Sequence, residues 1–216
     1  MDELERALEV AREYASRIYK RGRAPPSHRL DHVLRVVENS LRIAEELGLN
    51  EEEKKLLEIA AWLHDIALAS TGSKEGHAAK SAEIAEELLR GIVDERRLSL
   101  IASAIREHSW RGGLAPTSRI SEILQDADRL DALGAVGIYR VFAYGISAGR
   151  DFYELEDPLA EHREPDEFKY TLDHFFTKIL KLGERFNTEP AREEAKRRIE
   201  FIREYLEELE REISRD

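Results

Sequence analysis

Apolar residues recur along nearly the whole chain at the three- and four-residue spacing of an amphipathic helix. In residues 2–21, for example, Leu4, Leu8 and Ile18 fall on one stripe. No stretch shows the alternation of apolar and polar positions that is typical of a half-buried strand. The pattern therefore predicts an all-α protein.

Helix-breaking and helix-capping residues divide this pattern into segments. Pro25 and Pro26 end the first helix, Ser27 is expected to cap the second, and Asn50 is expected to cap the third. After the first, helices are predicted over about residues 27–46, 50–69, 74–90, 94–107, 118–133, 135–144, 166–185 and 189–215. The turn-rich stretch 150–165 is expected to form a loop or flap.

Composition narrows the functional classes. The 216 residues contain 34 Lys and Arg against 45 Asp and Glu, a formal net charge of −11, and no Cys. The missing Cys excludes a disulfide framework, a thiolate zinc site and a Cys nucleophile. The acidic balance argues against a nucleic-acid polymer as partner, since such surfaces need clustered basic residues. No signal peptide and no apolar run of about 20 residues is recognisable, so no membrane association is expected and a cytoplasmic protein is predicted.

The strongest chemical signal is His64-Asp65, which sits in a segment apolar enough to be core. A buried carboxylate beside a buried imidazole must be paired or must coordinate a cation. His32 lies on another predicted helix, and Asp128 and Asp131 share a face of a third by their i,i+3 spacing. Imidazoles and carboxylates together suit Mn²⁺, Fe²⁺, Ni²⁺, Co²⁺ or Mg²⁺. A hydrogen-bonded core histidine is the alternative for His64.

Three stretches resemble the HD-domain superfamily of metal-dependent phosphohydrolases, and are most similar to its small stand-alone, nucleotide pyrophosphohydrolase-like branch. They are residues 27–36, the Leu-His-Asp-Ile of 63–66, and 125–138 with Gln-Asp-Ala-Asp-Arg-Leu-Asp-Ala-Leu-Gly-Ala. The likeness continues through 174–175, 178–180 and 187–188, and covers about residues 15–205. It implies an HD-type helical bundle with additional long C-terminal helices. It also implies one divalent metal ion (Mn, Mg, Ni, Co or Fe) bound by His32, His64, Asp65 and Asp128.

Two residues depart from the branch's pattern. Arg29 stands where an Asp commonly follows the histidine of the first motif, and Ala67 stands where a Gly usually follows the His-Asp-Ile. Neither change removes a metal ligand, although the first could alter substrate preference.

The resemblance and the predicted metal shell lead to a hypothesis about chemistry. We expect metal-activated water to attack the phosphorus of a small phosphorylated substrate, a nucleotide by resemblance, with pyrophosphate release from a nucleoside triphosphate as one form of the reaction. Asp65, Asp131 and Arg35 are the candidate catalytic residues. The candidate substrate-binding residues are His28, Arg35, His77, Lys80, His108, Arg129 and Lys178, because phosphoryl transfer requires positive charge and hydrogen-bond donors around the phosphate oxygens.

Two other functions stay open at this point. His77 and His108 could be ligands of a second metal in a bimetal phosphodiesterase or dinucleotide hydrolase, or the chain could be a non-catalytic nucleotide-binding module. We expect residues 1–216 to form a single HD-type domain, with the metal-binding core over about 27–145 and helices of about 166–215 packed on it. The C-terminal helices offer a surface for a homodimer.

Overall fold

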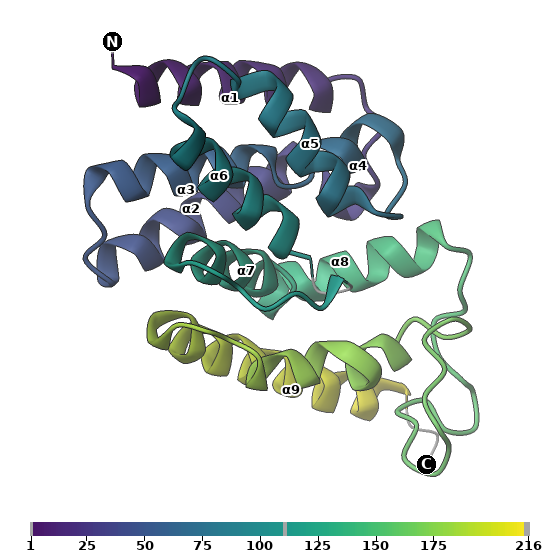
Figure 1. Ribbon diagram of the computed structural model, residues 1–216. Helices are drawn as coiled ribbons and strands as arrows, with labels where there is room; N and C mark the ends of the chain where they lie inside the picture. Colours follow the sequence, from purple (N-terminus) through teal and green to yellow (C-terminus); the bar gives the residue numbers. More distant parts are fainter. Residues whose placement is uncertain (1, 110–111, 214–216) are drawn as a thin grey trace. The chain divides into compact units, whose positions relative to one another are not determined.

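The computed structural model describes residues 2–109 and 112–213, and the regular structure of these residues is helical (Figure 1). They contain no β-strand beyond two isolated bridges, between Arg90 and Val93 and between Asp151 and Tyr170. The prediction of an all-α protein is thereby confirmed. None of the described helices combines the length and apolarity needed to cross a membrane.

Contacts along the chain define two compact units, residues 1–128 (unit 1) and 129–216 (unit 2), and the boundary falls inside helix α7. Unit 1 consists of α1 (Glu3–Tyr19), η1 (Pro26–His28), α2 (Leu30–Glu46), α3 (Glu51–Leu63), α4 (Ile66–Thr71), α5 (His77–Leu89), α6 (Glu95–Glu107) and most of α7 (Arg119–Asp131). Helix α3 is its centre, because it packs against α1, α2 and α6, while α5 packs against α4 and α6. The expectation of a single domain stays a prediction.

The caps of two helices show how the local sequence sets their starts. Asn50 accepts a hydrogen bond from the Glu53 amide and the Glu53 carboxylate accepts one from the Asn50 amide, so the predicted cap is confirmed as a full capping box. The prediction that Ser27 caps the second helix was wrong. Ser27 lies in the 3-10 turn η1, its hydroxyl contacts Nδ1 of His28, and α2 begins after Arg29.

The predicted helix 50–69 is two helices in the structure. Asp65 leaves helical geometry, with φ −108° and ψ 18°, so α3 ends before it and α4 begins after it. Helix α4 then ends at Gly72, whose φ of +76° is readily adopted only by glycine. The break places His64 and Asp65 between two helices instead of inside one continuous helix.

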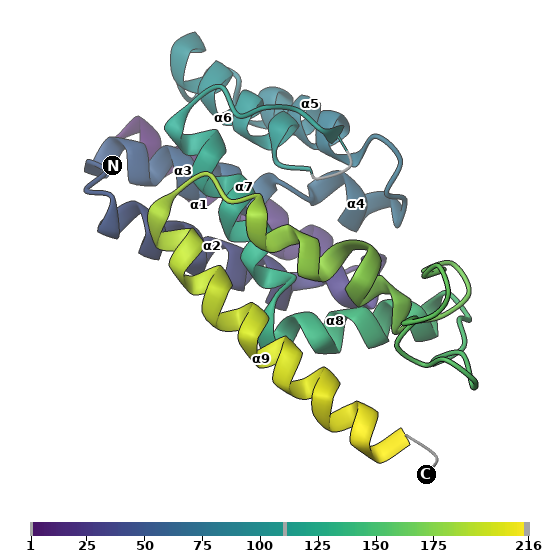
Figure 2. The same ribbon diagram turned by 90° about the horizontal axis from the view of Figure 1, so that it is seen from below.

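Unit 2 contains α8 (Gly134–Ser147), the π-helix η3 (Phe175–Ile179), the 3-10 helix η4 (Leu180–Glu184) and α9 (Glu189–Ile213), with α8 beside α9 (Figure 2). The predicted helix 166–185 was wrong over its first half. The buried carboxylate of Asp173 instead accepts hydrogen bonds from the Arg163 guanidinium, at 2.5 and 2.8 Å, and from the Asp166 amide, at 2.6 Å. These bonds hold residues 163–172 in a non-helical conformation. The expected loop over 150–165 is confirmed as a stretch without helix.

Candidate metal centre

The four predicted metal ligands come from three segments of unit 1. His32 is fully buried in α2, His64 and Asp65 form the break between α3 and α4, and Asp128 lies near the end of α7. Nε2 of His32 lies 3.3 Å from Nε2 of His64, 3.5 Å from Oδ1 of Asp128 and 3.7 Å from Oδ2 of Asp65. Residues almost a hundred positions apart therefore converge on one point.

The tautomers of three histidines follow from their hydrogen bonds. His64, His77 and His108 each place Nδ1 against the main-chain carbonyl oxygen three residues earlier, at 2.7, 2.9 and 2.6 Å. A carbonyl oxygen only accepts, so Nδ1 must carry the proton, and Nε2 of each neutral ring is left with a lone pair. Such a carbonyl contact is how proteins commonly orient an imidazole that binds a metal.

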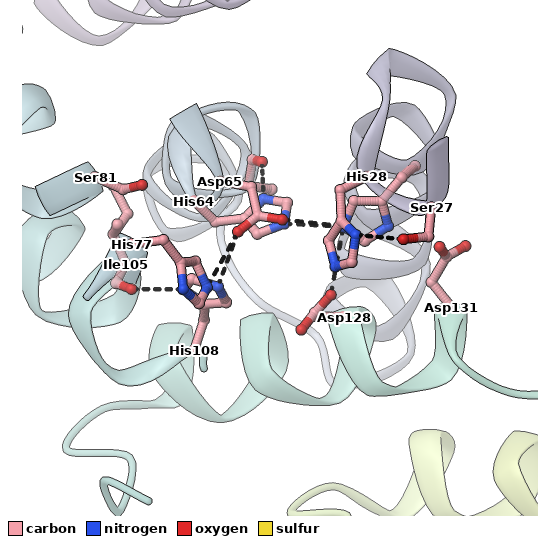
Figure 3. Close-up of polar contacts among 12 residues, drawn as sticks. Ser27, His28, His64, Asp65, His77, Ser81, Ile105, His108, Asp128 and Asp131 are labelled. Atoms are coloured by element: carbon pink, nitrogen blue, oxygen red, sulfur yellow. Dashed lines mark hydrogen bonds and ion pairs between the residues drawn. The ribbon is translucent and has the colours of Figure 1, made fainter. Parts of the chain in front are cut away.

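The carboxylate of Asp65 lies at the meeting point of these rings (Figure 3). Its Oδ2 is 3.7 Å from Nε2 of His64, and its Oδ1 is 3.4 and 3.5 Å from Nε2 of His77 and His108. Oδ1 is nevertheless a buried oxygen without a satisfactory hydrogen bond among the described residues. Lone pairs that face one another in this way repel unless a cation or a proton lies between them.

The electrostatics of the cluster favour bound positive charge. Burial lowers the pKa of His64 to about 4, which keeps this ring neutral at physiological pH. Burial also opposes the ionisation of Asp65, but His64, His108 and His32 outweigh it and hold the pKa of Asp65 well below its usual range. Burial opposes the protonation of His108, but the negative charges of Asp65 and Asp128 outweigh burial and raise the pKa of His108.

These residues fit a divalent metal ion. The described residues contain two groups whose ligand atoms all lie within 4.8 Å of one another, His32 with His64 and Asp128, and His64 with Asp65 and His108. Neutral imidazole nitrogens and ionised carboxylates are the ligands that such ions take. The orphaned Oδ1 of Asp65 gains a partner when a cation is present.

The imidazoles predicted to contact substrate extend this cluster into a row. Consecutive ring centroids are 5.3 Å apart from His28 to His32 and from His32 to His64, 5.0 Å from His64 to His108, and 5.3 Å from His108 to His77. The structure therefore brings His28, His77 and His108 to the predicted ligands, as the sequence hypothesis requires.

The other two predicted side chains of unit 1 have local partners. Arg35 pairs with Asp31 one turn earlier, at 2.9 Å, and Nζ of Lys80 donates to the Glu75 carbonyl oxygen at 3.2 Å. Contact of Arg35 or Lys80 with substrate stays a prediction.

The remaining predicted residues belong to unit 2. The buried carboxylate of Asp131 accepts a hydrogen bond from Nη1 of Arg140 at 2.5 Å. Nη1 of Arg129 donates to the carbonyl oxygen of Arg185 at 2.5 Å. Lys178 lies in the π-helix η3. The catalytic role of Asp131 and the substrate contacts of Arg129 and Lys178 remain predictions.

Sequence analysis missed one polar residue near the ligands. The Tyr19 hydroxyl, at the end of α1, is buried without a hydrogen-bond partner among the described residues. Burial, together with the charges of Asp65 and Asp128, raises the pKa of Tyr19 well above its usual range. The sequence shows Tyr19 only as one more member of an apolar stripe.

Comparison with known proteins decides the family. The family model of the HD domain matches residues 29–133 of the sequence, and this stretch contains all four predicted ligands. The protein YpgQ of Bacillus subtilis is 31% identical over 190 residues, which cover 86% of this chain and 84% of that protein. The chain belongs to the HD superfamily of metal-dependent phosphohydrolases. The HD family thus accounts for the His, His-Asp and Asp order, and implies a divalent metal.

Solved structures of HD proteins agree in fold over nearly the full length. An HD-superfamily hydrolase from Bacillus thuringiensis is 30% identical with a TM-score of 0.71, and the match covers 97% of each chain. A crystal structure of Bacillus subtilis YpgQ in complex with ADP is 26% identical with a TM-score of 0.71, covering 96% of each chain. The helical HD fold predicted from the sequence is confirmed.

Proposed function

We propose that this HD hydrolase acts on a nucleotide, cleaving a phosphoric anhydride bond by attack of water on phosphorus, with a nucleoside triphosphate pyrophosphohydrolase as its specific form. The observation that carries the proposal is the convergence of Nε2 of His32, Nε2 of His64 and the carboxylate of Asp65, whose Oδ1 is unpartnered among the described residues, in one buried cluster. The ADP bound to the related YpgQ supports a nucleotide as the ligand class.

The ion-binding residues are proposed to be His32, His64, Asp65 and Asp128. A divalent ion held there, with manganese as the first candidate, would lower the pKa of a coordinated water and polarise a phosphoryl oxygen. The unpartnered Oδ1 of Asp65 is proposed to accept a hydrogen bond from the attacking water. Its strongly lowered pKa keeps it an acceptor over the physiological range.

The other groups are assigned to the substrate. Nε2 of His77 and of His108 both approach Oδ1 of Asp65, and we assign the two rings to phosphate oxygens, to which Nε2 can donate a hydrogen bond only in the imidazolium form. His28, Arg35 and Lys80 are assigned to more distant phosphates by their charge or hydrogen-bonding capacity. Arg129 and Lys178 are also assigned to the phosphates, on the basis of the sequence. Asp131 is assigned to orienting a ligand or accepting a proton.

A second candidate function has its own support. His64, Asp65 and His108 form a three-ligand group next to that of His32, His64 and Asp128, with His77 adjoining. Two metal ions about 3.5–4 Å apart would make a bimetal phosphodiesterase or dinucleotide hydrolase. Metal stoichiometry separates the two: one ion per chain supports the leading proposal, and two support the alternative.

The test is a panel of nucleoside mono-, di- and triphosphates and dinucleotides, with Mn²⁺, Mg²⁺, Ni²⁺ or Co²⁺ and with products resolved as phosphate or pyrophosphate. Pyrophosphate released from a triphosphate supports the proposal. His64→Ala and Asp65→Ala should abolish turnover, whereas His162→Ala, in an exposed loop position, should not. Unchanged turnover in either ligand variant would overturn the site, and no turnover of any nucleotide by the metal-loaded protein would favour a non-catalytic binding module.

A further inference from the structure

The end of helix α6 is held by a side chain of another helix. Gln125 of α7 is buried, and its Nε2 donates hydrogen bonds to the main-chain carbonyl oxygens of Glu107, at 2.7 Å, and Leu114, at 3.0 Å. Only the NH2 end of an amide can donate, and it has two hydrogens, so the two carbonyl acceptors fix the orientation of the side chain. Glu107 is the last residue of α6, and the last carbonyl groups of a helix have no partner within it. Gln125 therefore caps α6 from outside.

A second pair of hydrogen bonds ties the segment between α6 and α7 to the same residue. The buried carboxylate of Glu107 accepts a hydrogen bond from the Thr117 amide at 2.9 Å and another from the Thr117 hydroxyl at 2.8 Å. Residue 107 is thus held by its carbonyl oxygen and by its side chain at once. The proposed hydrolysis uses neither of these contacts.

The residue that follows this cap is His108. Nδ1 of its ring contacts the Ile105 carbonyl oxygen at 2.6 Å, and Nε2 lies 3.5 Å from Oδ1 of Asp65 (Figure 3). A ring that is hydrogen-bonded to the last turn of α6 moves when that turn moves. The place of His108 in the cluster therefore depends on the end of α6, which Gln125 holds.

Gln125 also has a defined place relative to the predicted metal ligands. It precedes Asp128 by three residues in α7, so the two side chains lie on the same side of the helix. Oδ1 of Asp128 in turn lies 3.5 Å from Nε2 of His32. One turn of α7 thus carries both a predicted ligand and the group that holds the residue before His108.

We propose that Gln125 is a positioning residue, which holds the Glu107 carbonyl group and thereby places the imidazole of His108 for contact with a phosphate oxygen of the substrate. The inference rests on the proposed function, in which His108 is assigned to phosphate. Gln125 acts only through His108, so its loss should weaken the binding of substrate and leave the metal ligands in place.

The first measurement follows the His108 ring by NMR in chelator-treated, full-length protein that carries 15N in its histidines, without nucleotide. The His108 signal is the one that His108→Gln lacks. Gln125→Met removes the amide donor and keeps the length of the side chain, and it should shift the His108 signal but not that of the exposed His162. Ser121→Ala is the matched control, because it removes a buried hydroxyl one turn earlier in α7, and it should shift neither signal.

The second measurement is a double-mutant cycle. Calorimetry follows the binding of a nucleoside triphosphate analogue, with a methylene group between its α and β phosphorus atoms, to the Mn²⁺-loaded protein. Gln125→Met and His108→Gln should each weaken binding about tenfold, and the double variant should bind no more weakly than His108→Gln, because the contact that Gln125 supports is already lost. Ser121→Ala should bind the analogue as the parent protein does. The Mn²⁺ affinity of Gln125→Met should stay within about twofold of that of the parent.

Three results would overturn the proposal: a His108 signal that Gln125→Met leaves unchanged, analogue binding by Gln125→Met as tight as that of the parent, or single losses that multiply in the double variant. If Gln125→Met fails to fold, Gln125→Asn takes its place, since its shorter side chain cannot reach both carbonyl groups. Failure of the hydrolase proposal is a separate result, because the parent protein itself would then neither bind nor turn over nucleotides. The NMR measurement uses no nucleotide and would still decide whether Gln125 places His108.

Discussion

The Nε2 atoms of His32 and His64 face each other at 3.3 Å inside unit 1, while the other nitrogen of His64 is held by the Ala61 carbonyl oxygen. A cation between the two rings and the nearby carboxylates gives the lone pair on Nε2 of His64 and the carboxylate oxygens a positively charged partner. The folded protein should therefore bind a divalent ion far better than the unfolded chain does, and the ion should stabilise it.

Metal addition is expected to raise the melting temperature of the chelator-treated protein. At a free metal concentration one hundred times the Kd, the gain in the free energy of unfolding is about 2.7 kcal/mol. Differential scanning calorimetry with and without Mn²⁺ measures it. His64→Ala should lose the gain, and His162→Ala should keep it; an equal metal-dependent shift in His64→Ala would contradict the site.

Removing the Tyr19 hydroxyl is expected to stabilise the metal-free protein. The hydroxyl is buried without a hydrogen-bond partner among the described residues, so Tyr19→Phe relieves a desolvation cost of about 1–3 kcal/mol. Urea unfolding of the chelator-treated protein measures the change. Tyr14→Phe, on the same helix but with a half-exposed side chain, is the control and should be neutral. A loss of stability in Tyr19→Phe would show that the hydroxyl has a partner.

Asp131→Ala is expected to destabilise the protein whether or not Asp131 takes part in catalysis. The change leaves the guanidinium of Arg140, whose side chain is 11% exposed, without its carboxylate, at a cost of about 3–5 kcal/mol. Urea unfolding measures the loss, and the Asp131→Leu/Arg140→Met double variant should recover most of it. The turnover of the double variant then separates a catalytic role of Asp131 from its role in stability. Full activity of the double variant would show that Asp131 is not a catalytic residue.

Gly145→Ala is expected to destabilise unit 2 by about 1–3 kcal/mol, because the new Cβ would lie 2.2 Å from Oγ1 and 2.5 Å from Cγ2 of Thr171. Thermal unfolding measures the loss. The Gly145→Ala/Thr171→Ala double variant should recover part of it, since the second change removes the clashing atoms. Equal stability of Gly145→Ala and the parent protein would mean that α8 moves freely away from Thr171.

Glu194 should contribute a pH-dependent part of the stability of unit 2. Hydrogen bonds from Arg197 and Arg198 outweigh burial and lower the pKa of Glu194 from its ordinary value of 4.5 to about 2. Because the folded-state pKa is depressed, this stabilisation is fully present above pH 4.5 and is lost as the pH falls toward 2. The expected contribution is about 1 kcal/mol after screening by solvent.

Urea unfolding of the parent protein and of Glu194→Gln, compared between pH 6 and pH 2.5, tests the contribution of Glu194. The gap between the two proteins should be largest at pH 6 and should shrink at the acid end. Glu193→Gln is the control for the loss of one negative charge on the same helix. The Glu193 side chain is solvent-exposed beside Lys196, so its ion pair should contribute little to stability. A gap independent of pH would contradict the ion-pair explanation.

Much of the site was readable from the sequence because its motif is local. The His64-Asp65 pair stands out as polar residues inside a core segment, and the order of His32, His64-Asp65 and Asp128 marks the HD family. A helix start that is set by one capping side chain could also be predicted from the sequence, as the capping box of Asn50 shows. These features follow from the chemistry of neighbouring residues, which the sequence states directly.

Other features were decided by tertiary contacts. The helix break at Asp65 is not marked by a proline or glycine, and the turns before Asp173 form because its buried carboxylate binds Arg163 across ten residues. The hydroxyl of Ser27 contacts Nδ1 of His28 instead of capping helix α2. In each case a contact in the folded chain overrode the local preference.

The sequence by itself determined the class of fold, the family and the candidate ligand residues, since helix periodicity and short motifs are local properties. Only the tertiary structure decided that five imidazoles form one row, that four of them turn Nε2 toward Asp65, and that Tyr19 is buried near the same charges. The physical reason is that a side chain's tautomer, burial and partners depend on segments far away in the chain, which meet only when the helices pack.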